Sequence, residues 1–291
     1  MVCLRHGRAA RPVPLHSGPM PPSPSGRDGP RYPVGDADRA AFERDGWVVL
    51  RGLLAPDELD ALTRIAMRFL RREIPVAGRD FCDMTADYER PLEQFSIVNV
   101  MLPRRYHPPL AGNVYERRAA DVATQLCGPD MELDYDQFVA KPPGRADAVF
   151  HWHQDLAYWP VTPDTRTASF WLALDVTDLD NGCVQFVPGS HAEPRLRPHA
   201  PLLGDRQRSH TLVATLRDDD RPVPARLQPG DVSVHHERTL HGSGGNTSAR
   251  WRRGYVVAFR ARETVAAERA MGFTHSHNDR VDVLRRVGRE G

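Results

Sequence analysis

The sequence is poor in the features that mark nucleic-acid-binding, secreted and membrane-spanning chains. Its formal net charge is +1, so no global field attracts nucleic acid or an anionic membrane surface. Its four cysteines lie far apart and form no C-x-x-C pair, which disfavours a zinc knuckle or a disulfide framework. No apolar run approaches the roughly 18 residues that a membrane helix needs. These absences predict a cytoplasmic protein with neither nucleic acid nor membrane among its partners, and they leave its oligomeric state open.

Lysine is almost absent as well. Of the 39 lysines and arginines only Lys141 is a lysine, and the abundance of alanine, proline and glycine suggests drift under a GC-rich genome. Arginine has thus replaced lysine wherever a positive charge alone suffices. Two interpretations of Lys141 stay open: a position that requires a compact ammonium group, or a surface lysine that drift has not converted.

The N-terminal segment differs in composition from the rest of the chain. Residues 1–33 are rich in Pro, Gly, Arg and Ser and carry no hydrophobic period, so we expect them to be disordered. The lack of acidic residues before Asp28 also fits an organelle transit peptide, and a mis-assigned start with Met20 as the true initiator is an equal alternative. We expect residues 34–291 to form a single domain, which is long enough for a substantial core.

Helical patterns precede strand patterns along this domain. Pro56 followed by Asp57 and Glu58 signals a helix start, and the periodicity predicts helices over 37–45, 56–72 and 115–127, a strand over 47–50 and an irregular stretch over 78–93. From about residue 134 short strand-like runs alternate with turn residues, which is typical of a sandwich or barrel. The expected strands are 135–141, 149–153, 167–176, 183–187, 211–216, 231–236 and 251–260.

The first chemical motif is the run from Phe150 to Asp155, which contains His-x-His-x-Asp. Residues i and i+2 of a strand point to the same face, roughly 7 Å apart. His153 and Asp155 can therefore bind one metal ion from one strand. His151 shares that face and competes for the same role, so the motif alone leaves the choice open.

Two further elements lie downstream. His241 ends a strand just before a Gly-rich turn, where it is either a third ligand or a histidine that caps a hairpin. Arg252 lies on the strand of residues 251–260, on the face that also carries Gly254, Val256 and Ala258. An arginine among small residues fits a barrel interior with room for a ligand, whereas the alternative is a solvated side chain.

Taken together, these elements predict a facial triad. Two histidines and one carboxylate bind Fe(II) and leave three coordination sites open. A 2-oxo acid fills two of them and O2 the third. The distal carboxylate of that acid needs a planar bidentate partner, which a guanidinium supplies.

At this point the chain resembles the phytanoyl-CoA dioxygenase-like oxygenases, a group that also includes ectoine hydroxylases. The resemblance covers roughly residues 37–260. Its motifs are the opening Phe42-x-x-Asp45-Gly46-Trp47-Val48-Val49-Leu50-Arg51-Gly52, then His153-x-Asp155, Asn181-Gly182-Cys183, Val187-Pro188-Gly189-Ser190-His191, and His241-x-Ser243 with Arg252 eleven residues after the histidine.

The resemblance implies a mainly β fold, a double-stranded β-helix over about residues 134–260 with N-terminal helices packed on it. It also implies Fe(II) on His153, Asp155 and His241, and 2-oxoglutarate as cosubstrate. Arg252 and Ser243 would hold its C5 carboxylate, with Trp171 beside it. Core packing is the alternative for Trp171, and Gln137 and Lys141 are weaker candidates for the cosubstrate or substrate.

The expected reaction converts 2-oxoglutarate and O2 to succinate and CO2 while a C–H bond of a small-molecule substrate is oxidised, by hydroxylation or oxidative ring closure. The presence of Asp155 disfavours halogenation, because halogenases of related families carry a small residue there. We take the remaining histidines as surface or core residues: His107, His191, His199, His210, His235, His236, His275 and His277.

The substrate is not readable from the sequence, although the composition hints at a natural-product tailoring enzyme of secondary metabolism. The rivals are a non-redox cupin-type metal enzyme, such as an isomerase, and a barrel that only binds a ligand. The residues expected at the mouth of the site are Tyr158, Trp159, Phe95, Met84, Arg104, Arg105 and Tyr106.

Overall fold

The computed structural model describes residues 29–279. Residues 1–28, most of the segment expected to be disordered, lie outside the described residues, as do 280–291. The helices are α1 (Asp36–Asp45), α2 (Pro56–Leu70), α3 (Pro103–Tyr106), α4 (Val114–Cys127) and α5 (Arg262–Ala270). The strands are β1 (Trp47–Leu50), β2 (Phe81–Asp83), β3 (Val98–Met101), β4 (Met131–Lys141), β5 (Phe150–His153), β6 (Thr167–Ala173), β7 (Val184–Phe186), β8 (His199–Pro201), β9 (Leu212–Ala214), β10 (Val223–Pro224), β11 (Val232–His235), β12 (His241–Ser243) and β13 (Arg252–Ala261).

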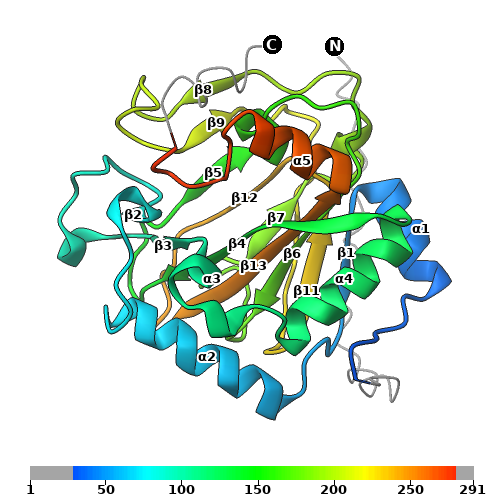
Figure 1. Cartoon of the computed structure of the whole chain (residues 1–291). Helices are drawn as coiled ribbons and strands as arrows, with labels where there is room; N and C mark the ends of the chain where they lie inside the picture. The colour runs from blue at the N-terminus through cyan, green and yellow to red at the C-terminus, as the bar shows by residue number, and fades with distance from the viewer. Residues whose placement is uncertain (1–28, 280–291) are drawn as a thin grey trace, which may run out of the picture.

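Two antiparallel sheets form the body of the molecule (Figure 1). The larger sheet has seven strands in the order β1-β11-β6-β13-β4-β3-β2, and the smaller has four in the order β10-β7-β12-β5. Strands β8 and β9 pair separately and lie beyond β5 at one end of the molecule (Figure 1). This is the two-sheet β architecture that the sequence predicts.

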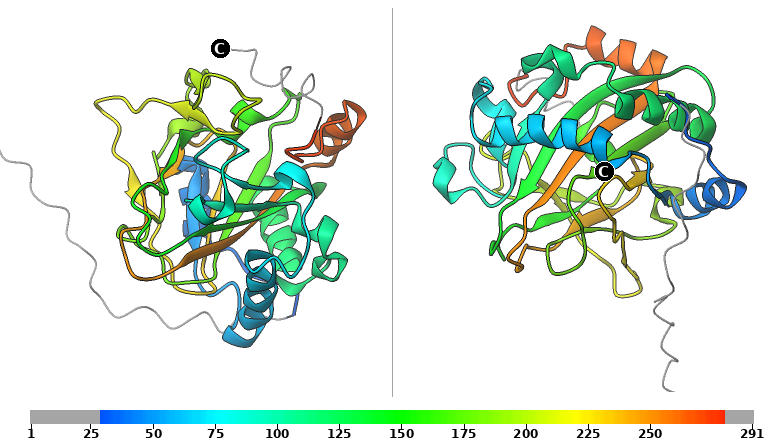
Figure 2. Two further views of the ribbon diagram at one scale, coloured as in Figure 1. Left: turned by 90° about the vertical axis from the view of Figure 1, so that its left-hand side faces the viewer. Right: turned by 90° about the horizontal axis from the view of Figure 1, so that it is seen from below.

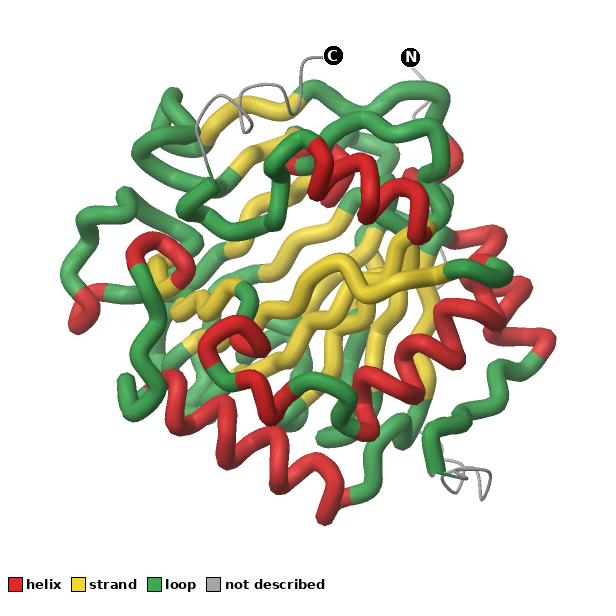
Figure 3. Tube along the Cα trace, in the orientation of Figure 1, coloured by secondary structure: helices red, strands yellow, loops and turns green. Residues whose placement is uncertain are grey.

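Helices α2 and α4 cover the outer face of the larger sheet, as Figure 3 and the right-hand view in Figure 2 show. Their apolar residues, such as Leu59, Phe69 and Val122, join sheet residues such as Phe170 and Val257 in the main hydrophobic core. Burying this helical stripe against the sheet is what orders the N-terminal half of the chain.

Strand β13 shows how the sheet separates two environments. Its residues Tyr255, Val257 and Phe259 belong to the core beneath the helices. Val256 and Ala258, which alternate with them, belong to a second cluster between the two sheets. The predicted division of this strand into two faces is confirmed, because successive strand residues point to opposite sides.

The boundaries of several elements differ from those predicted. Strands β2 and β3 and helix α5 were not expected, because their short or polar patterns give no periodic signal. Tyr32, which falls in the segment expected to be disordered, is 4% exposed, and its hydroxyl donates to the carbonyl of Arg51. Order therefore begins before residue 34. None of the helices within residues 29–279 has the length and apolar character needed to cross a bilayer.

Candidate active site

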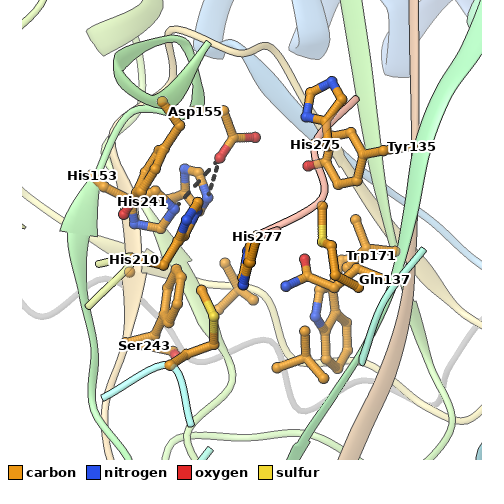
Figure 4. Close-up of a pocket in the computed structure, with 18 of the residues that line it drawn as sticks. Tyr135, Gln137, His153, Asp155, Trp171, His210, His241, Ser243, His275 and His277 are labelled. Atoms are coloured by element: carbon orange, nitrogen blue, oxygen red, sulfur yellow. Dashed lines mark ion pairs between the residues drawn. The ribbon is translucent and has the colours of Figure 1, made fainter. Parts of the chain in front are cut away.

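A cavity lies between the two sheets. Strands β4, β6 and β13 of the larger sheet line one wall, and β5, β7 and β12 of the smaller sheet line the other. The loops around Tyr158, His210 and His275 close its rim. Figure 4 shows His153, Asp155 and His241 on one side of this space and Tyr135, Gln137 and Trp171 on the other.

Three predicted ligands converge on the smaller-sheet side. His153 ends β5, His241 begins β12, and the two residues are paired across the β5–β12 ladder. One carboxylate oxygen of Asp155, Oδ1, lies 3.5 Å from the Nε2 atom of each histidine. One ligand atom from each of the three residues lies within 4.8 Å of the others, a spacing that suits a single metal ion.

The backbone fixes which imidazole nitrogen faces the centre. The Nδ1 atom of His153 lies 2.7 Å from the carbonyl oxygen of His151, and that of His241 lies 2.9 Å from the carbonyl oxygen of Thr239. A carbonyl only accepts, so each Nδ1 carries the proton and each Nε2 presents a lone pair. Burial, followed by the neighbouring imidazoles, lowers the pKa of His241 well below its ordinary value, which favours the neutral form that a metal requires.

The second carboxylate oxygen of Asp155 accepts two hydrogen bonds from side chains outside the ligand set. Its Oδ2 accepts from His235 Nε2 at 3.1 Å and from the hydroxyl of Ser169 at 3.3 Å. Burial alone would raise the pKa of this carboxyl, but the surrounding imidazoles outweigh burial and hold the pKa well below its ordinary value. Asp155 therefore presents an ionised oxygen toward the two histidines in a fixed orientation.

The route by which His153 and Asp155 meet differs from the prediction. We expected both on one strand, but β5 ends at His153 and Asp155 opens a 3-10 turn over Asp155–Tyr158. The turn brings the carboxylate back toward His153, which a straight strand would not do. His151, the competing ligand, is absent from the residues that line the cavity and contributes its carbonyl instead.

The cavity wall on β13 carries a buried guanidinium. Arg252 is 2% exposed, and its guanidinium carbon lies 4.3 Å above the ring of Trp171. A Cβ atom added to Gly254 would lie 2.2 Å from Trp171, so glycine at this position leaves the room for the indole. Trp171 belongs to the hydrophobic cluster between the sheets and also forms the surface on which Arg252 lies.

Arg252 has no acidic partner among residues 29–279. Within residues 29–279 no carboxylate forms an ion pair or a hydrogen bond with it, and its Nε is buried without a hydrogen-bond partner. Burial lowers its pKa to about 10, so the group stays charged at neutral pH. A buried cation in this state is ready for an anionic ligand, since desolvation without a partner is costly.

Lys141 lies beside this guanidinium. It is paired with Arg252 in the β4–β13 ladder, it is 0% exposed, and its Nζ donates to the Ser243 hydroxyl and the Gly244 carbonyl, each at 2.6 Å. Burial, and then the charge of Arg252, lowers its pKa well below the ordinary value. The interpretation of Lys141 as an unconverted surface lysine is therefore wrong.

The remaining predicted cosubstrate residues also line the cavity. Gln137 follows the same face of β4 as Lys141, and its side-chain amide donates to Asn99 at 2.5 Å. Ser243, on β12, accepts from Lys141. Arg252, Lys141, Gln137 and Trp171 thus line the larger-sheet wall at one end of the cavity. Ser243 meets them from β12 of the smaller sheet, which also carries His241.

The predicted mouth residues are partly wrong. Met84, Tyr158 and Trp159 line the cavity, but Phe95, Arg104, Arg105 and Tyr106 do not. Phe95 stacks on Phe81 with ring centroids 5.9 Å apart, Arg104 pairs with Asp136 and Glu116, Arg105 is exposed, and the Tyr106 hydroxyl donates to Asp80. Phe95, Arg104 and Tyr106 thus have partners outside the cavity, and Arg105 faces solvent.

Four histidines that we had taken as surface or core residues line the cavity instead: His210, His235, His275 and His277. His210 and His277 stack with ring centroids 4.0 Å apart, and His210 also stacks on Tyr158. They lie on loops or at a strand end with no motif around them. The sequence held no signal for their convergence.

With the geometry known, comparison with other proteins gives the family. The model of the family described as phytanoyl-CoA dioxygenase (PhyH) matches residues 42–254. The chain belongs to the phytanoyl-CoA dioxygenase family. This is a family of Fe(II)/2-oxoglutarate-dependent dioxygenases, and the resemblance drawn from the sequence motifs is confirmed.

Curated relatives are distant in sequence. The peroxisomal phytanoyl-CoA dioxygenase of Rattus norvegicus is 24% identical over 223 residues, which are 74% of this chain and 65% of the rat protein. The ectoine dioxygenase of Sphingopyxis alaskensis is 27% identical over 233 residues, which are 74% of this chain and 72% of that protein. The chain thus spans about two thirds of the length of the rat enzyme.

Solved structures share the fold. EvdO2 from Micromonospora carbonacea var. aurantiaca is 27% identical with a TM-score of 0.65, covering 79% of this chain and 92% of EvdO2. Its complex with 2-oxoglutarate is 26% identical with a TM-score of 0.62 and the same coverage of 79% and 92%. These matches confirm the predicted double-stranded β-helix with its packed helices.

Proposed function

We propose that the protein is an Fe(II)- and 2-oxoglutarate-dependent oxygenase that oxidises a C–H bond of a small molecule. One observation carries this proposal: a three-residue metal ligand set lines the same cavity as a buried guanidinium that has no acidic partner in the described part of the chain. The first fits Fe(II) and the second fits the far carboxylate of a 2-oxo acid. The family assignment and the likeness to a 2-oxoglutarate complex support the same activity.

In this proposal His153, Asp155 and His241 hold Fe(II). The residues present fit the ion, because two neutral imidazoles and one ionised carboxylate are the donors of a facial triad and their Nε2 and Oδ1 atoms already face one another. His235 and Ser169 keep Asp155 oriented through its other oxygen. When bound, Fe(II) with 2-oxoglutarate and O2 supplies oxidation of a C–H bond, coupled to formation of succinate and CO2.

Arg252 binds the C5 carboxylate of 2-oxoglutarate in the same proposal. Its planar guanidinium can donate two parallel hydrogen bonds, and Trp171 beneath it limits its rotation. Lys141 and Ser243 form a hydrogen-bonded pair beside it and extend the positive end of the cavity. Gln137 borders this end from β4. The burial of Arg252, Lys141 and Ser243 excludes water from the cosubstrate's charged end.

The substrate is a small molecule with an apolar or aromatic body, such as a natural product. The rest of the cavity is lined mainly by apolar and aromatic side chains, including Met84, Tyr135, Tyr158, Trp159 and Phe273. SnoK, described as a carbocyclase from nogalamycin biosynthesis, has a similar fold at 23% identity and a TM-score of 0.60. That likeness concerns the fold alone, so hydroxylation or ring closure and a role in secondary metabolism stay part of the proposal.

A non-redox cupin-type metal enzyme is the rival function. It would use the three ligands but has no need of a buried guanidinium next to a buried ammonium group. Placing buried cations in the interior without an acidic partner costs free energy, and the C5 carboxylate of the cosubstrate offsets part of that cost. The arrangement of Lys141 and Arg252 therefore favours the oxygenase.

The test is release of succinate from 2-oxoglutarate by the Fe(II)-loaded protein, across a panel of aromatic and polycyclic natural products. We expect Fe(II)-dependent succinate formation that a true substrate accelerates and that His153→Ala abolishes. A protein that binds Fe(II) but neither binds nor consumes 2-oxoglutarate would instead be a cupin-type metal protein. Chloride-dependent halogenation by the unmodified protein would contradict the assigned role of Asp155.

A further inference from the structure

His275 forms part of the cavity wall across from the metal ligands. Figure 4 shows His275 and Tyr135 on the far side of the space from His153 and His241. The ring of His275 stacks on Tyr135 with centroids 4.5 Å apart and meets Trp159 and Phe273 edge-on at 5.5 and 4.5 Å. Neither the metal nor the cosubstrate residues use this imidazole.

Two carboxylates fix the orientation of the His275 ring. Its Nε2 lies 2.8 Å from Asp134 Oδ2 and 3.5 Å from Glu268 Oε2, and both carboxylates are fully buried. A carboxylate on one imidazole nitrogen holds the proton there and stabilises the protonated ring. Within residues 29–279 no hydrogen bond engages the other nitrogen, Nδ1.

Two irregularities of the backbone bring the carboxylate of Asp134 and the imidazole of His275 together. The β4–β13 register shifts by one residue at this point: Ala258 pairs with Tyr135 and Phe259 pairs with Leu133, which leaves Asp134 without a partner residue. Such an extra residue re-aims side chains and is frequent beside active sites. His275 has a φ of 67°, a left-handed conformation that a residue other than glycine rarely adopts. Strain of this kind persists where surrounding contacts hold it.

The Asp134, Glu268 and His275 cluster also has the ligand types of a second metal site. Two guanidiniums already occupy its surroundings, however. Arg269 lies 2.6 Å from Asp134, and Arg260 forms ion pairs with Asp134, Glu268 and Glu237. Because the two guanidiniums neutralise the carboxylates, a metal ion could bind here only by displacing Arg260 and Arg269. The cluster acts as a buried ion network that orients His275.

We propose that His275 donates a hydrogen bond from Nδ1 to a carboxylate or another anionic oxygen of the substrate and so determines substrate specificity. Tyr135, Trp159 and Phe273 around it suit a flat apolar body that carries this acidic group. The anion anchors one end of the substrate on the larger sheet, while its remainder extends toward His153, Asp155 and His241. This inference deepens the proposed oxygenase function and rests on it.

The ionisation of His275 supports a donor role. Burial lowers its pKa, but Asp134 and Glu268 outweigh burial and raise the pKa above the ordinary value. Anion binding therefore holds constant below this pKa and falls about tenfold per pH unit above it, because only the protonated ring donates from both nitrogens. The charged and titratable groups that face the ring are Asp134 and Tyr135 of β4, Arg260 of β13, Glu268 and Arg269 of α5, and His210 and His277 of the loops.

The test uses benzoate as a flat anionic probe and benzamide as its neutral isostere. Protein labelled with ¹³C at histidine Cε1 is loaded with Zn(II), a redox-inert substitute for Fe(II), and saturated with 2-oxoglutarate. The His275 resonance is assigned with His275→Gln. We expect benzoate to shift this resonance and raise the pKa of His275, and benzamide to do neither. Excess 2-oxoglutarate should leave benzoate affinity unchanged.

Asp134→Asn tests the carboxylate behind the ring. It should weaken benzoate binding about tenfold or more without changing Zn(II) or 2-oxoglutarate affinity. Glu132→Gln, the same change at an exposed position two residues away on β4, should alter none of these. The pH titration of unmodified protein needs no variant, so the proposal stays testable even if Asp134→Asn fails to fold.

Three outcomes would overturn the proposal. The first is equal binding of benzamide and benzoate, and the second is benzoate affinity that rises with pH. The third is a second bound equivalent of Zn(II) that disappears in Asp134→Asn, which would make the cluster a metal site. Failure of the unmodified protein to bind Zn(II) or 2-oxoglutarate is measured first and separately, and it counts against the oxygenase function rather than against His275.

Discussion

Lys141 and Arg252 face each other across the β4–β13 ladder, so two buried cations meet at one end of the cavity. Each has a different companion: Lys141 donates to Ser243 and Gly244, whereas Arg252 lies over Trp171. No carboxylate within residues 29–279 forms an ion pair with either of them. The planar guanidinium of Arg252 and the compact ammonium group of Lys141 therefore lead to separate predictions.

Arg252→Lys should weaken 2-oxoglutarate binding although the charge is kept. An ammonium group cannot reproduce the two parallel hydrogen bonds of a guanidinium or its stacking on Trp171. Truncating one partner of a buried charge-assisted pair costs roughly 2–5 kcal/mol, which corresponds to about 30-fold or more in affinity. Titration calorimetry with 2-oxoglutarate and Zn(II) measures this loss.

Arg253→Lys is the matched control, since Arg253 is the next residue and pairs with Asp175 on the opposite face of β13. It should leave 2-oxoglutarate affinity within about twofold of the unmodified protein. Equal losses in the two variants would mean that Arg252 acts through general stability of the strand, and the cosubstrate role would have to be abandoned.

Lys141→Arg should also reduce 2-oxoglutarate affinity, for a reason of size. The Lys141 ammonium group is enclosed by Ser243 and Gly244, and a Cβ atom on Gly182 would already lie 3.1 Å from Nζ. A larger guanidinium overpacks this space, at a cost of about 1–3 kcal/mol. Thermal unfolding and 2-oxoglutarate titration of the variant should both reveal the effect.

Lys141→Met separates size from charge. Methionine keeps roughly the length of the lysine side chain and removes its charge. The affinity for 2-oxoglutarate should therefore fall, while the ligand-free protein remains at least as stable as the unmodified one. Burial of an unneutralised charge costs free energy in the absence of the ligand. If both Lys141 variants bind 2-oxoglutarate as the unmodified protein does, Arg252 is the only cosubstrate cation that remains.

The pH dependence of cosubstrate binding should report Lys141. Burial and the neighbouring Arg252 lower its pKa well below the ordinary value, and a bound carboxylate favours its charged form. 2-Oxoglutarate affinity is therefore highest below the pKa of Lys141 and declines as pH rises through it. The decline should vanish in Lys141→Met, and a persistent slope in that variant would assign it to another group.

Metal binding should distinguish His153 from His151. His153→Ala removes an inward-facing Nε2 and should abolish Fe(II) binding and turnover, whereas His151→Ala should keep both, since only the His151 carbonyl contacts the site. Equilibrium dialysis under anaerobic conditions gives the metal content of each variant. Loss of Fe(II) from His151→Ala alone would reverse the ligand assignment.

His235 should raise the affinity of the site for Fe(II) without being a ligand of the ion. Its Nε2 lies 3.1 Å from Asp155 Oδ2, the carboxylate oxygen that does not face the two histidine ligands. Removing a hydrogen bond that orients a metal ligand typically lowers metal affinity about 10–100-fold. We therefore expect His235→Ala to bind Fe(II) more weakly by this amount yet still to bind one equivalent. His236→Gln, at the adjacent position, should leave the affinity unchanged, and the opposite pattern would remove His235 from the site.

The sequence by itself determined the residues whose placement depends on local geometry. Strand alternation put Arg252 on the inner face of β13, and the motifs around His153 and His241 identified a ligand set that the structure brings together. It also singled out Lys141 through composition alone, without deciding whether that residue is buried. These inferences succeed because side-chain direction along a strand follows from a period of two residues.

Tertiary structure decided what depends on contacts between distant segments. The turn after β5 aims Asp155 at His153, and the loops that carry His210, His275 and His277 fold over the cavity from positions far apart in the sequence. Phe95 and Arg104 were misplaced for the same reason, since their partners lie on other elements. A one-residue shift in register turns Asp134 toward His275, and no local pattern encodes that shift because it arises only when β4 pairs with β13.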